Sequence, residues 1–244
     1  MSSQQVPKPN TDQQEPQAQA SRLPKIMLTV VVLTGIVVVS FTLGAQYFGR
    51  QAIKSINSDD LSIKQIIVGN DVVNIPANVF RLKNQREATT SKRLDLFYLW
   101  PDFEGYSLAR HDRFYGKEAS SDNLIFVTIE NRKISLDMSA RLEAVYSQLL
   151  EGAPQKTNFG LVFQRLKPEA GYSGEELFYD KNSPSPYVVR CQREPSAQTS
   201  ASCMRDINIG KGLSLTYRFS RDLLANWRSI EATIVNLSAG YLPN

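Results

Sequence analysis

The chain has little of what most metal and catalytic centres are built from. Among its 244 residues there is one histidine, His111, and there are two cysteines, Cys191 and Cys203. A structural zinc site usually takes four Cys or His ligands, often supplied as CxxC pairs, and the sequence contains no such pair. We therefore predict that the protein holds no metal and no cofactor.

The chain also lacks a strong charge of either sign. Its formal net charge is +4, from 28 basic and 24 acidic residues. A domain that binds nucleic acid usually carries a concentrated basic patch, so we predict no nucleic-acid partner. The most basic segment, 83–93 (KNQREATTSKR) together with Arg81, is expected to be a solvated loop. The alternative is a contact with anionic lipid headgroups or with an acidic partner.

Catalytic motifs are missing as well. The GKG at 210–212 lacks the Ser or Thr that follows Lys in a phosphate-binding loop, and it lies between two predicted strands. The GYSG at 171–174 lacks the second glycine of a nucleophile elbow. His111 lies in a charged stretch, where a solvated histidine is the ordinary outcome. We predict no catalytic residue, and a protein that is not an enzyme.

One long hydrophobic run is present near the N-terminus. No charged residue occurs from Ile26 to Gly49. As a helix these residues would span about 36 Å, which exceeds the ~30 Å hydrocarbon core of a bilayer. We expect a transmembrane helix over 25–49 that contacts the lipid bilayer through 26–48. The run is longer than the apolar region of a typical cleaved signal peptide.

The segments on either side of this run are polar. Residues 1–24 are rich in Gln and Pro and have almost nothing to bury, so we expect a disordered cytoplasmic tail. Residues 50–60 are expected to continue the helix in polar form and then to link it to a domain at 61–244. Ser40 and Gly44 form a small-xxx-small pair that would let two helices approach closely in a homodimer. A lone anchor is the alternative.

The cysteines decide the expected orientation, because three basic residues precede the helix and three follow it closely. Cys191 and Cys203 flank a short hydrophilic stretch, and a disulfide there would contribute about 3 kcal/mol in the chain-entropy model. Structural disulfides persist in oxidising compartments, whereas two unrelated thiols are the alternative. We expect a single-pass protein of the bacterial inner membrane, with its N-terminus in the cytoplasm and its C-terminal domain in the periplasm.

The domain is expected to contain many strands and two helices. The predicted strands are Leu61–Val68, Leu94–Trp100, Leu124–Glu130, 160–166, 175–180, 186–191, Cys203–Ile209 and Leu213–Phe219. The last two flank a glycine turn and predict a hairpin. In Asn74–Arg81, Pro76 is a local break, and the segment is expected to lead into a short strand. Helices are predicted over Asp137–Glu151 and Arg221–Leu237, where apolar residues recur every three or four positions. This order predicts an α+β domain with a mostly antiparallel sheet.

One aromatic segment, LDLFYLWPDFEGY, is the strongest candidate for a binding surface. It places Trp100, Phe103 and Tyr106 close in sequence to Asp102 and Glu104. Aromatic rings beside carboxylates are typical of sugar-binding clefts, and carboxylate pairs hydrolyse glycosides. Side chains on a strand alternate between its faces, so a sheet core that ends in an aromatic turn is the competing interpretation.

These features predict a membrane-anchored cell-envelope protein whose non-catalytic domain binds a protein or cell-wall partner or has a structural role. A hydrolase of envelope glycans is the first alternative, and it would use Asp95, Asp102 or Glu104. A membrane-bound sensor or regulator is the second, although the tail contains no recognisable binding element.

Overall fold

The computed structural model describes residues 23–115, 123–194 and 201–243, and within 23–25 and 46–56 it describes the backbone alone. Almost all of the predicted tail, 1–24, lies outside the described residues. The chain forms two compact units, Met1–Ala52 and Ile53–Asn244.

The first unit contains most of a long helix, α1 (Leu23–Ile56). Its window Ile26–Ala45 has a mean hydropathy of 2.6, and none of the window is buried inside the protein. Within the described ranges this is the one helix long and apolar enough to cross a membrane. The hydroxyls of Thr34 and Thr42 donate to main-chain carbonyls of the same helix, which suits an apolar surrounding because polar groups there need internal partners.

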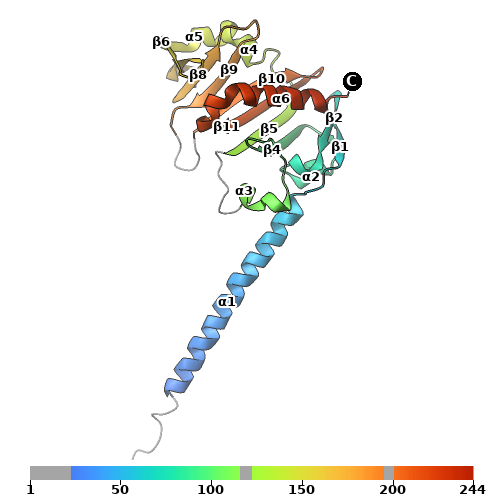
Figure 1. The fold of residues 1–244 in the computed structure, drawn as a ribbon, viewed down its shortest axis with the longest axis vertical. Coiled ribbons are helices and arrows are strands. Elements are labelled where there is room, and N and C mark those ends of the chain that lie inside the picture. The colour runs from blue at the N-terminus through green and yellow to red at the C-terminus, as the bar shows by residue number, and fades with distance from the viewer. Residues whose placement is uncertain (1–22, 116–122, 195–200, 244) are drawn as a thin grey trace, which may run out of the picture. The chain divides into compact units, whose positions relative to one another are not determined.

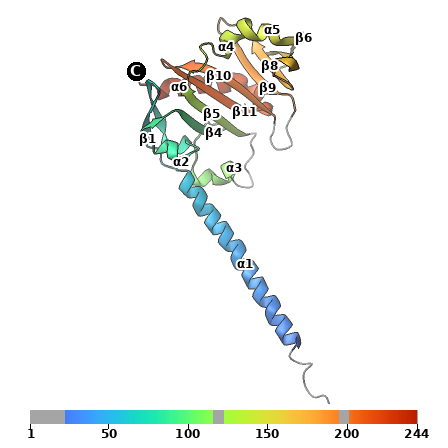
Figure 2. The ribbon, with the colours of Figure 1, turned by 180° about the vertical axis from the view of Figure 1, so that it is seen from behind.

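The second unit is built on a small sheet and a large sheet (Figures 1 and 2). The small sheet has the order β2-β1-β3, from β1 (Ile63–Val68), β2 (Asp71–Pro76) and β3 (Thr90–Ser91). The large sheet has the order β4-β5-β11-β10-β9-β8-β7-β6. Its strands are β4 (Arg93–Leu99), β5 (Leu124–Asn131), β6 (Leu150–Lys156), β7 (Val162–Leu166), β8 (Glu175–Asp180), β9 (Tyr187–Gln192), β10 (Ser202–Ile209) and β11 (Leu213–Ser220).

Short helices connect the strands, and one longer helix ends the domain. They are η1 (Ala77–Val79), α2 (Lys83–Arg86), η2 (Leu108–Arg110), α3 (His111–Tyr115), α4 (Met138–Arg141), η4 (Leu142–Tyr146), α5 (Ser147–Leu149), η5 (Pro168–Ala170), η6 (Arg221–Asn226) and α6 (Trp227–Tyr241). Neighbouring strands of the large sheet are antiparallel throughout. This arrangement confirms the predicted α+β fold with a mostly antiparallel sheet.

Helix α6 lies across one face of the large sheet (Figure 1). At its start, the Trp227 ring packs against Tyr187 of β9 with ring centroids 4.5 Å apart. At its end, the Tyr241 hydroxyl is hydrogen-bonded to the Tyr98 hydroxyl of β4. Buried side chains of the small sheet join the same core. The helix therefore reaches from one half of the large sheet to the other.

The opposite face of the large sheet carries two smaller apolar clusters. One packs Met138, Leu142 and Tyr146, from α4 and η4, against buried side chains of β7, β8 and β9. The other packs Phe114 of α3 against Phe97 of β4, with ring centroids 4.9 Å apart. Between these clusters the central strands present polar side chains, which is the alternation expected of a half-covered sheet.

In the large sheet, β9 and β10 share fewer residue pairs than any other two neighbouring strands, and we call this junction the seam. Strands β9 and β10 pair at two positions, Cys203 with Cys191 and Met204 with Arg190. In contrast, β10 and β11 pair along eight positions. The Sγ atoms of Cys191 and Cys203 lie 1.99 Å apart, the distance of a disulfide bond. The predicted cysteine pair is thus brought together, and it lies at the junction with the fewest residue pairs in the sheet.

Beyond the paired positions, the side chain of Arg205 fills the seam and is 3% exposed. Its guanidinium donates to the main-chain carbonyl of Val188 on β9 at 2.9 Å and to the hydroxyl of Ser139 on α4 at 3.1 Å. It also binds both carboxylate oxygens of Glu231 on α6. A buried guanidinium needs such partners for all its donors. Arg205 therefore joins β10, β9, α4 and α6.

Several local expectations were wrong where turn residues interrupt the pattern. In Asn74–Arg81 the expected break at Pro76 is where β2 ends, but the helical turn η1 follows it instead of a short strand. Strand β6 was not predicted, because the first residues of LEGAPQK were assigned to the end of the helix Asp137–Glu151 and the remainder contain Gly and Pro. Helix α2 occupies part of the expected loop at 83–93. The hairpin at 210–212 is confirmed, and the Asp71 carboxylate accepts hydrogen bonds from two of its main-chain N–H groups.

Replacing Cys191 and Cys203 together with Ser is expected to lower the free energy of unfolding by about 3 kcal/mol, because the cross-link closes a loop of sequence separation 12. Urea denaturation of the full-length protein in detergent measures the change. Wild type treated with a reductant is the control and should match the double variant. Equal stability of the oxidised wild type and the double variant would contradict the expectation.

Replacing Arg205 with Met is expected to cost about 3 kcal/mol, because it leaves the Glu231 carboxylate partly buried beside no cation. Adding Glu231→Gln to that variant should restore part of the loss, since the uncompensated charge is then removed. The same denaturation experiment on the two single variants and the double variant gives the coupling. Additive losses would show that Arg205 and Glu231 act independently.

Candidate binding cleft

The loop that follows β4 folds back onto the end of that strand. The Leu99 N–H donates to the Glu104 carbonyl, and the Tyr106 N–H donates to the Asn78 carbonyl, both at 2.9 Å. Gly105 lies against Asn78, where an added Cβ would come within 2.6 Å of the Asn78 side-chain nitrogen. The close approach requires glycine at this position. These contacts fix the loop that carries Phe103 and Glu104.

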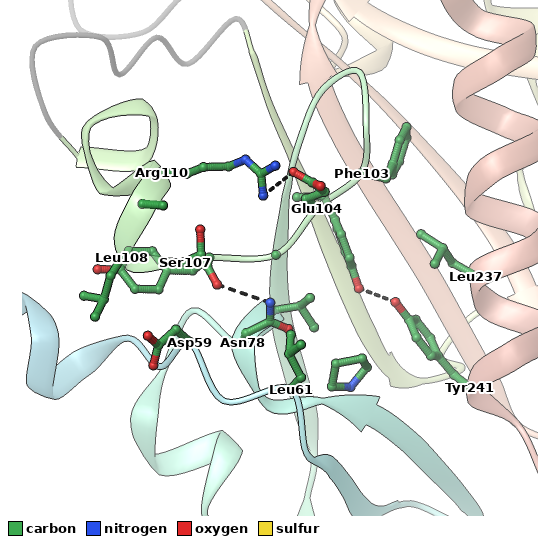
Figure 3. Close-up of a pocket in the computed structure, with 16 residues that line it drawn as sticks. Asp59, Leu61, Asn78, Phe103, Glu104, Ser107, Leu108, Arg110, Leu237 and Tyr241 are labelled. Carbon is green, nitrogen blue, oxygen red and sulfur yellow. Dashed lines mark hydrogen bonds and ion pairs between the residues drawn. The ribbon is translucent and has the colours of Figure 1, made fainter.

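A cleft of about 710 Å³ opens beside this loop (Figure 3). It lies between the loop, the segment that follows α1, and the end of α6. The residues that line it are Asp59, Leu61, Pro76, Asn78, Val79, Tyr98, Phe103, Glu104, Gly105, Tyr106, Ser107, Leu108, Ala109, Arg110, Leu237 and Tyr241. Most of the wall is apolar, and the rim carries two well exposed leucines, Leu61 and Leu108.

Most polar groups in the cleft are bound to one another. The Glu104 carboxylate is paired with the Arg110 guanidinium, and the Asn78 amide donates to the Tyr106 carbonyl at 3.2 Å. The Ser107 hydroxyl oxygen is buried and has no hydrogen-bond partner among the described residues. Such a hydroxyl is available to a bound group, because a buried polar atom gains from any partner.

Two tyrosine hydroxyls meet at the floor of the cleft. Tyr98 and Tyr241 are hydrogen-bonded to each other, and both side chains are buried. Burial raises the pKa of Tyr241 to about 12. Burial, together with the neighbouring Tyr241, raises the pKa of Tyr98 well above its ordinary value. Both groups therefore stay neutral at physiological pH, which keeps the floor of the cleft uncharged.

The predicted surface residues take different positions. Phe103 and Glu104 are half-buried and line the cleft. Tyr106 also lines it, but its ring is 1% exposed and its hydroxyl lies 3.1 Å from Nδ1 of the lone histidine. Trp100 is half-buried and packs edge-on against Phe103, with ring centroids 5.7 Å apart. Asp102 is exposed, and neither it nor Trp100 lines the cleft.

The carboxylates considered for glycan hydrolysis do not gather in this cleft. Asp95 lies on β4 and is bound by Arg93 at 2.8 Å and by the side chains of Gln85 and Thr128. Of Asp95, Asp102 and Glu104, Glu104 alone lines the cleft. Its carboxylate forms an ion pair with the Arg110 guanidinium. A glycosidase needs two carboxylates across one cleft, with one of them free to donate a proton. The geometry of these three residues does not provide that pair.

Other lining residues were not found from the sequence. Leu61 was placed in a strand, and Leu237 was assigned to the apolar face of the last predicted helix. Leu108 and Arg110 lie in a stretch with no periodic pattern. Their convergence depends on long-range packing, for which one sequence carries no signal. In the described ranges, no cluster of three or more His, Cys, Asp or Glu is arranged to hold a metal ion.

Comparison with known proteins gives a likeness of fold. No family model and no curated protein matches the chain. An immunity protein of the Stenotrophomonas maltophilia type IV secretion system has 12% identity and a TM-score of 0.53, covering 75% of this chain and 94% of its own. The iron-regulated outer membrane lipoprotein FrpD of Neisseria meningitidis has 12% identity and a TM-score of 0.47, covering 78% and 96%. At such identity the first match shows that this fold is shared with an immunity protein.

Raising the pH from about 10 to about 12 is expected to destabilise wild type more steeply than the Tyr241→Phe variant. In that range the unfolded tyrosine releases its proton while folded Tyr241 keeps it. The native state then binds more protons than the unfolded state, so the free energy of unfolding falls as pH rises. A shift of this size corresponds to roughly 3 kcal/mol.

Denaturation midpoints measured across that pH range test the expectation. Tyr172→Phe, which alters a half-buried tyrosine outside the cleft, is the matched control and should follow wild type. Parallel pH dependences for wild type and Tyr241→Phe would contradict the assignment.

Proposed function

We propose that the chain is a membrane-anchored, non-catalytic protein of the bacterial cell envelope that binds a partner through the cleft around Phe103. In this proposal α1 crosses the inner membrane once, the N-terminus lies in the cytoplasm and the domain lies in the periplasm. Lipid contact through residues 26–48 and a helix pair formed by two copies through Ser40 and Gly44 belong to the same proposal.

Two observations support this placement. The apolar window of α1 has no covering inside the protein, so a bilayer is its natural surrounding. Cys191 and Cys203 lie at disulfide distance in the domain, which fits an oxidising compartment better than the cytoplasm.

The polar groups of the cleft favour a binding site over a catalytic one. Glu104 with Arg110, and Tyr98 with Tyr241, are each engaged internally. The second carboxylate of the lining, Asp59, is exposed to solvent. A catalytic acid, base or nucleophile must be free to reach a reacting atom. An apolar cleft with few free polar groups instead suits an apolar side chain of a partner, with Ser107 available to orient it. The aromatic ring of Phe103 is the expected anchor.

A protein partner is the version that we favour. The fold is shared with an immunity protein, as described above, and the cleft has no row of exposed aromatic rings of the kind on which sugars stack. The exposed leucines at the rim would be covered on binding. Burying them makes the free energy of binding more favourable in proportion to the apolar area buried.

Placing a photo-crosslinking amino acid at Leu108, on the rim, is expected to give a covalent adduct in living cells. The same amino acid at Val145, which is similarly exposed on η4, is the matched control and should give none. Adding Phe103→Ala to the Leu108 probe should remove most of the adduct, because the anchoring ring is lost. The adducts are measured by immunoblotting and identified by mass spectrometry.

The proposal is contradicted by either of two results. An adduct that forms equally with and without Phe103 would show that the cleft is not the binding site. Equal adducts at Leu108 and Val145 would indicate non-specific contact. Circular dichroism of the Phe103→Ala protein checks that the fold is intact.

A further inference from the structure

We propose that the free edge of β1 is a docking site for an extended segment of a partner protein, which would pair with β1 as an added strand. The site is separate from the cleft around Phe103. The inference therefore goes beyond the proposed function and does not depend on it.

The hydrogen-bonding pattern of β1 defines this edge. β1 and β2 are joined at a two-residue turn, and Val68 pairs with Asp71 next to it. In an antiparallel pair the main-chain groups of successive residues point alternately to the partner strand and away from it. Ile63, Gln65 and Ile67 therefore direct their N–H and C=O groups away from β2. The Ile67 N–H confirms this direction, because it donates to the Thr89 carbonyl at 2.9 Å.

β3 covers only one end of the edge. It consists of Thr90 and Ser91, which pair in parallel with Ile67 and Val68. The chain before it is coiled into α2, so no strand lies beside the first half of β1. In the described part of the chain, the outward N–H and C=O groups of Ile63 and Gln65 have no hydrogen-bond partner. Unpaired N–H and C=O groups on a strand edge are the groups with which an added strand usually pairs.

A groove of about 530 Å³ gives access to these groups. Residues of β1 form one wall, and residues of α2 and the turn after it form the opposite wall. The lining residues are Ser58, Asp60, Ile63, Lys64, Gln65, Arg86, Glu87, Ala88 and Thr89. On the outer face Ile63 is 59% exposed. An added strand with an apolar residue opposite Ile63 would cover it through a cross-strand pair.

The shape of the groove selects the occupant. Because the free edge is one wall of the groove and the turn after α2 is the opposite wall, the same edge of a second copy, which carries its own opposite wall, cannot reach it. A single extended segment from another protein can enter. The lining is mostly polar and mixes Lys64 and Arg86 with Asp60 and Glu87, so we expect selection by main-chain pairing rather than by net charge.

Gln65→Pro tests the pairing directly, because it removes the outward N–H and leaves the β1–β2 hydrogen bonds, which use the neighbouring residues. Proline is tolerated at strand edges whose N–H is not used. Gln65→Val is the matched control, since it changes the same side chain and keeps the N–H. Ala88→Trp provides a second test by filling the groove without altering β1, in case the proline variant folds poorly.

The probe is a set of 12-residue peptides selected from a random library against the full-length protein in detergent. Peptides for the site should slow amide hydrogen exchange at Ile63 and Gln65. Their affinity should fall about tenfold in Gln65→Pro, because one main-chain hydrogen bond is lost, and by a similar factor in Ala88→Trp, because the indole occupies the groove. It should stay unchanged in Gln65→Val, which keeps the N–H. Phe103→Ala should leave this affinity unchanged, which separates the site from the cleft.

Three outcomes would overturn the inference. The first is a library that yields no peptide protecting Ile63 and Gln65 from exchange. The second is a selected peptide that binds the proline and tryptophan variants as tightly as wild type. The third is self-association of the full-length protein that Gln65→Pro abolishes, which would identify a second copy as the occupant.

Discussion

The rest of the domain depends on the seam between β9 and β10. It joins two halves of the large sheet, β4-β5-β11-β10 and β9-β8-β7-β6, through two residue pairs. The disulfide of Cys191 and Cys203 holds one end of the seam, and the buried guanidinium of Arg205 fills the remainder. A covalent link and an ionic network thus replace the hydrogen bonds that a fully paired strand would supply, since the exposed main chain must find other partners.

The seam and the candidate cleft are far apart in the sheet order, but α6 connects them. Helix α6 crosses the seam, with Trp227 packed near β9 at one end and Tyr241 bonded to β4 at the other. Glu231, in the middle of α6, is bound by Arg205. The position of α6 therefore follows from both halves of the sheet, and α6 supplies Leu237 and Tyr241 to the cleft.

The general architecture could be predicted from the sequence, because α1, the main strands and α6 are encoded by local patterns of apolar residues. The proximity of Cys191 and Cys203 followed from their spacing and polar surroundings. The role of Arg205 could not be predicted, since a lone arginine in a strand gives no sign that it will be buried. The candidate site was predicted in part: Phe103 and Glu104 lie in a recognisable aromatic segment, whereas Leu61, Leu108 and Leu237 meet them only through long-range packing.

Hydrogen exchange on the full-length protein, before and after reduction of the disulfide, tests the central claim most directly. If the seam joins two halves of the sheet, reduction should speed exchange selectively in β8, β9 and α4, next to the seam. The amides of β4, β5 and β11 should keep their protection, because their own pairing is long. Equal acceleration in all eight strands, or no acceleration at all, would contradict the account.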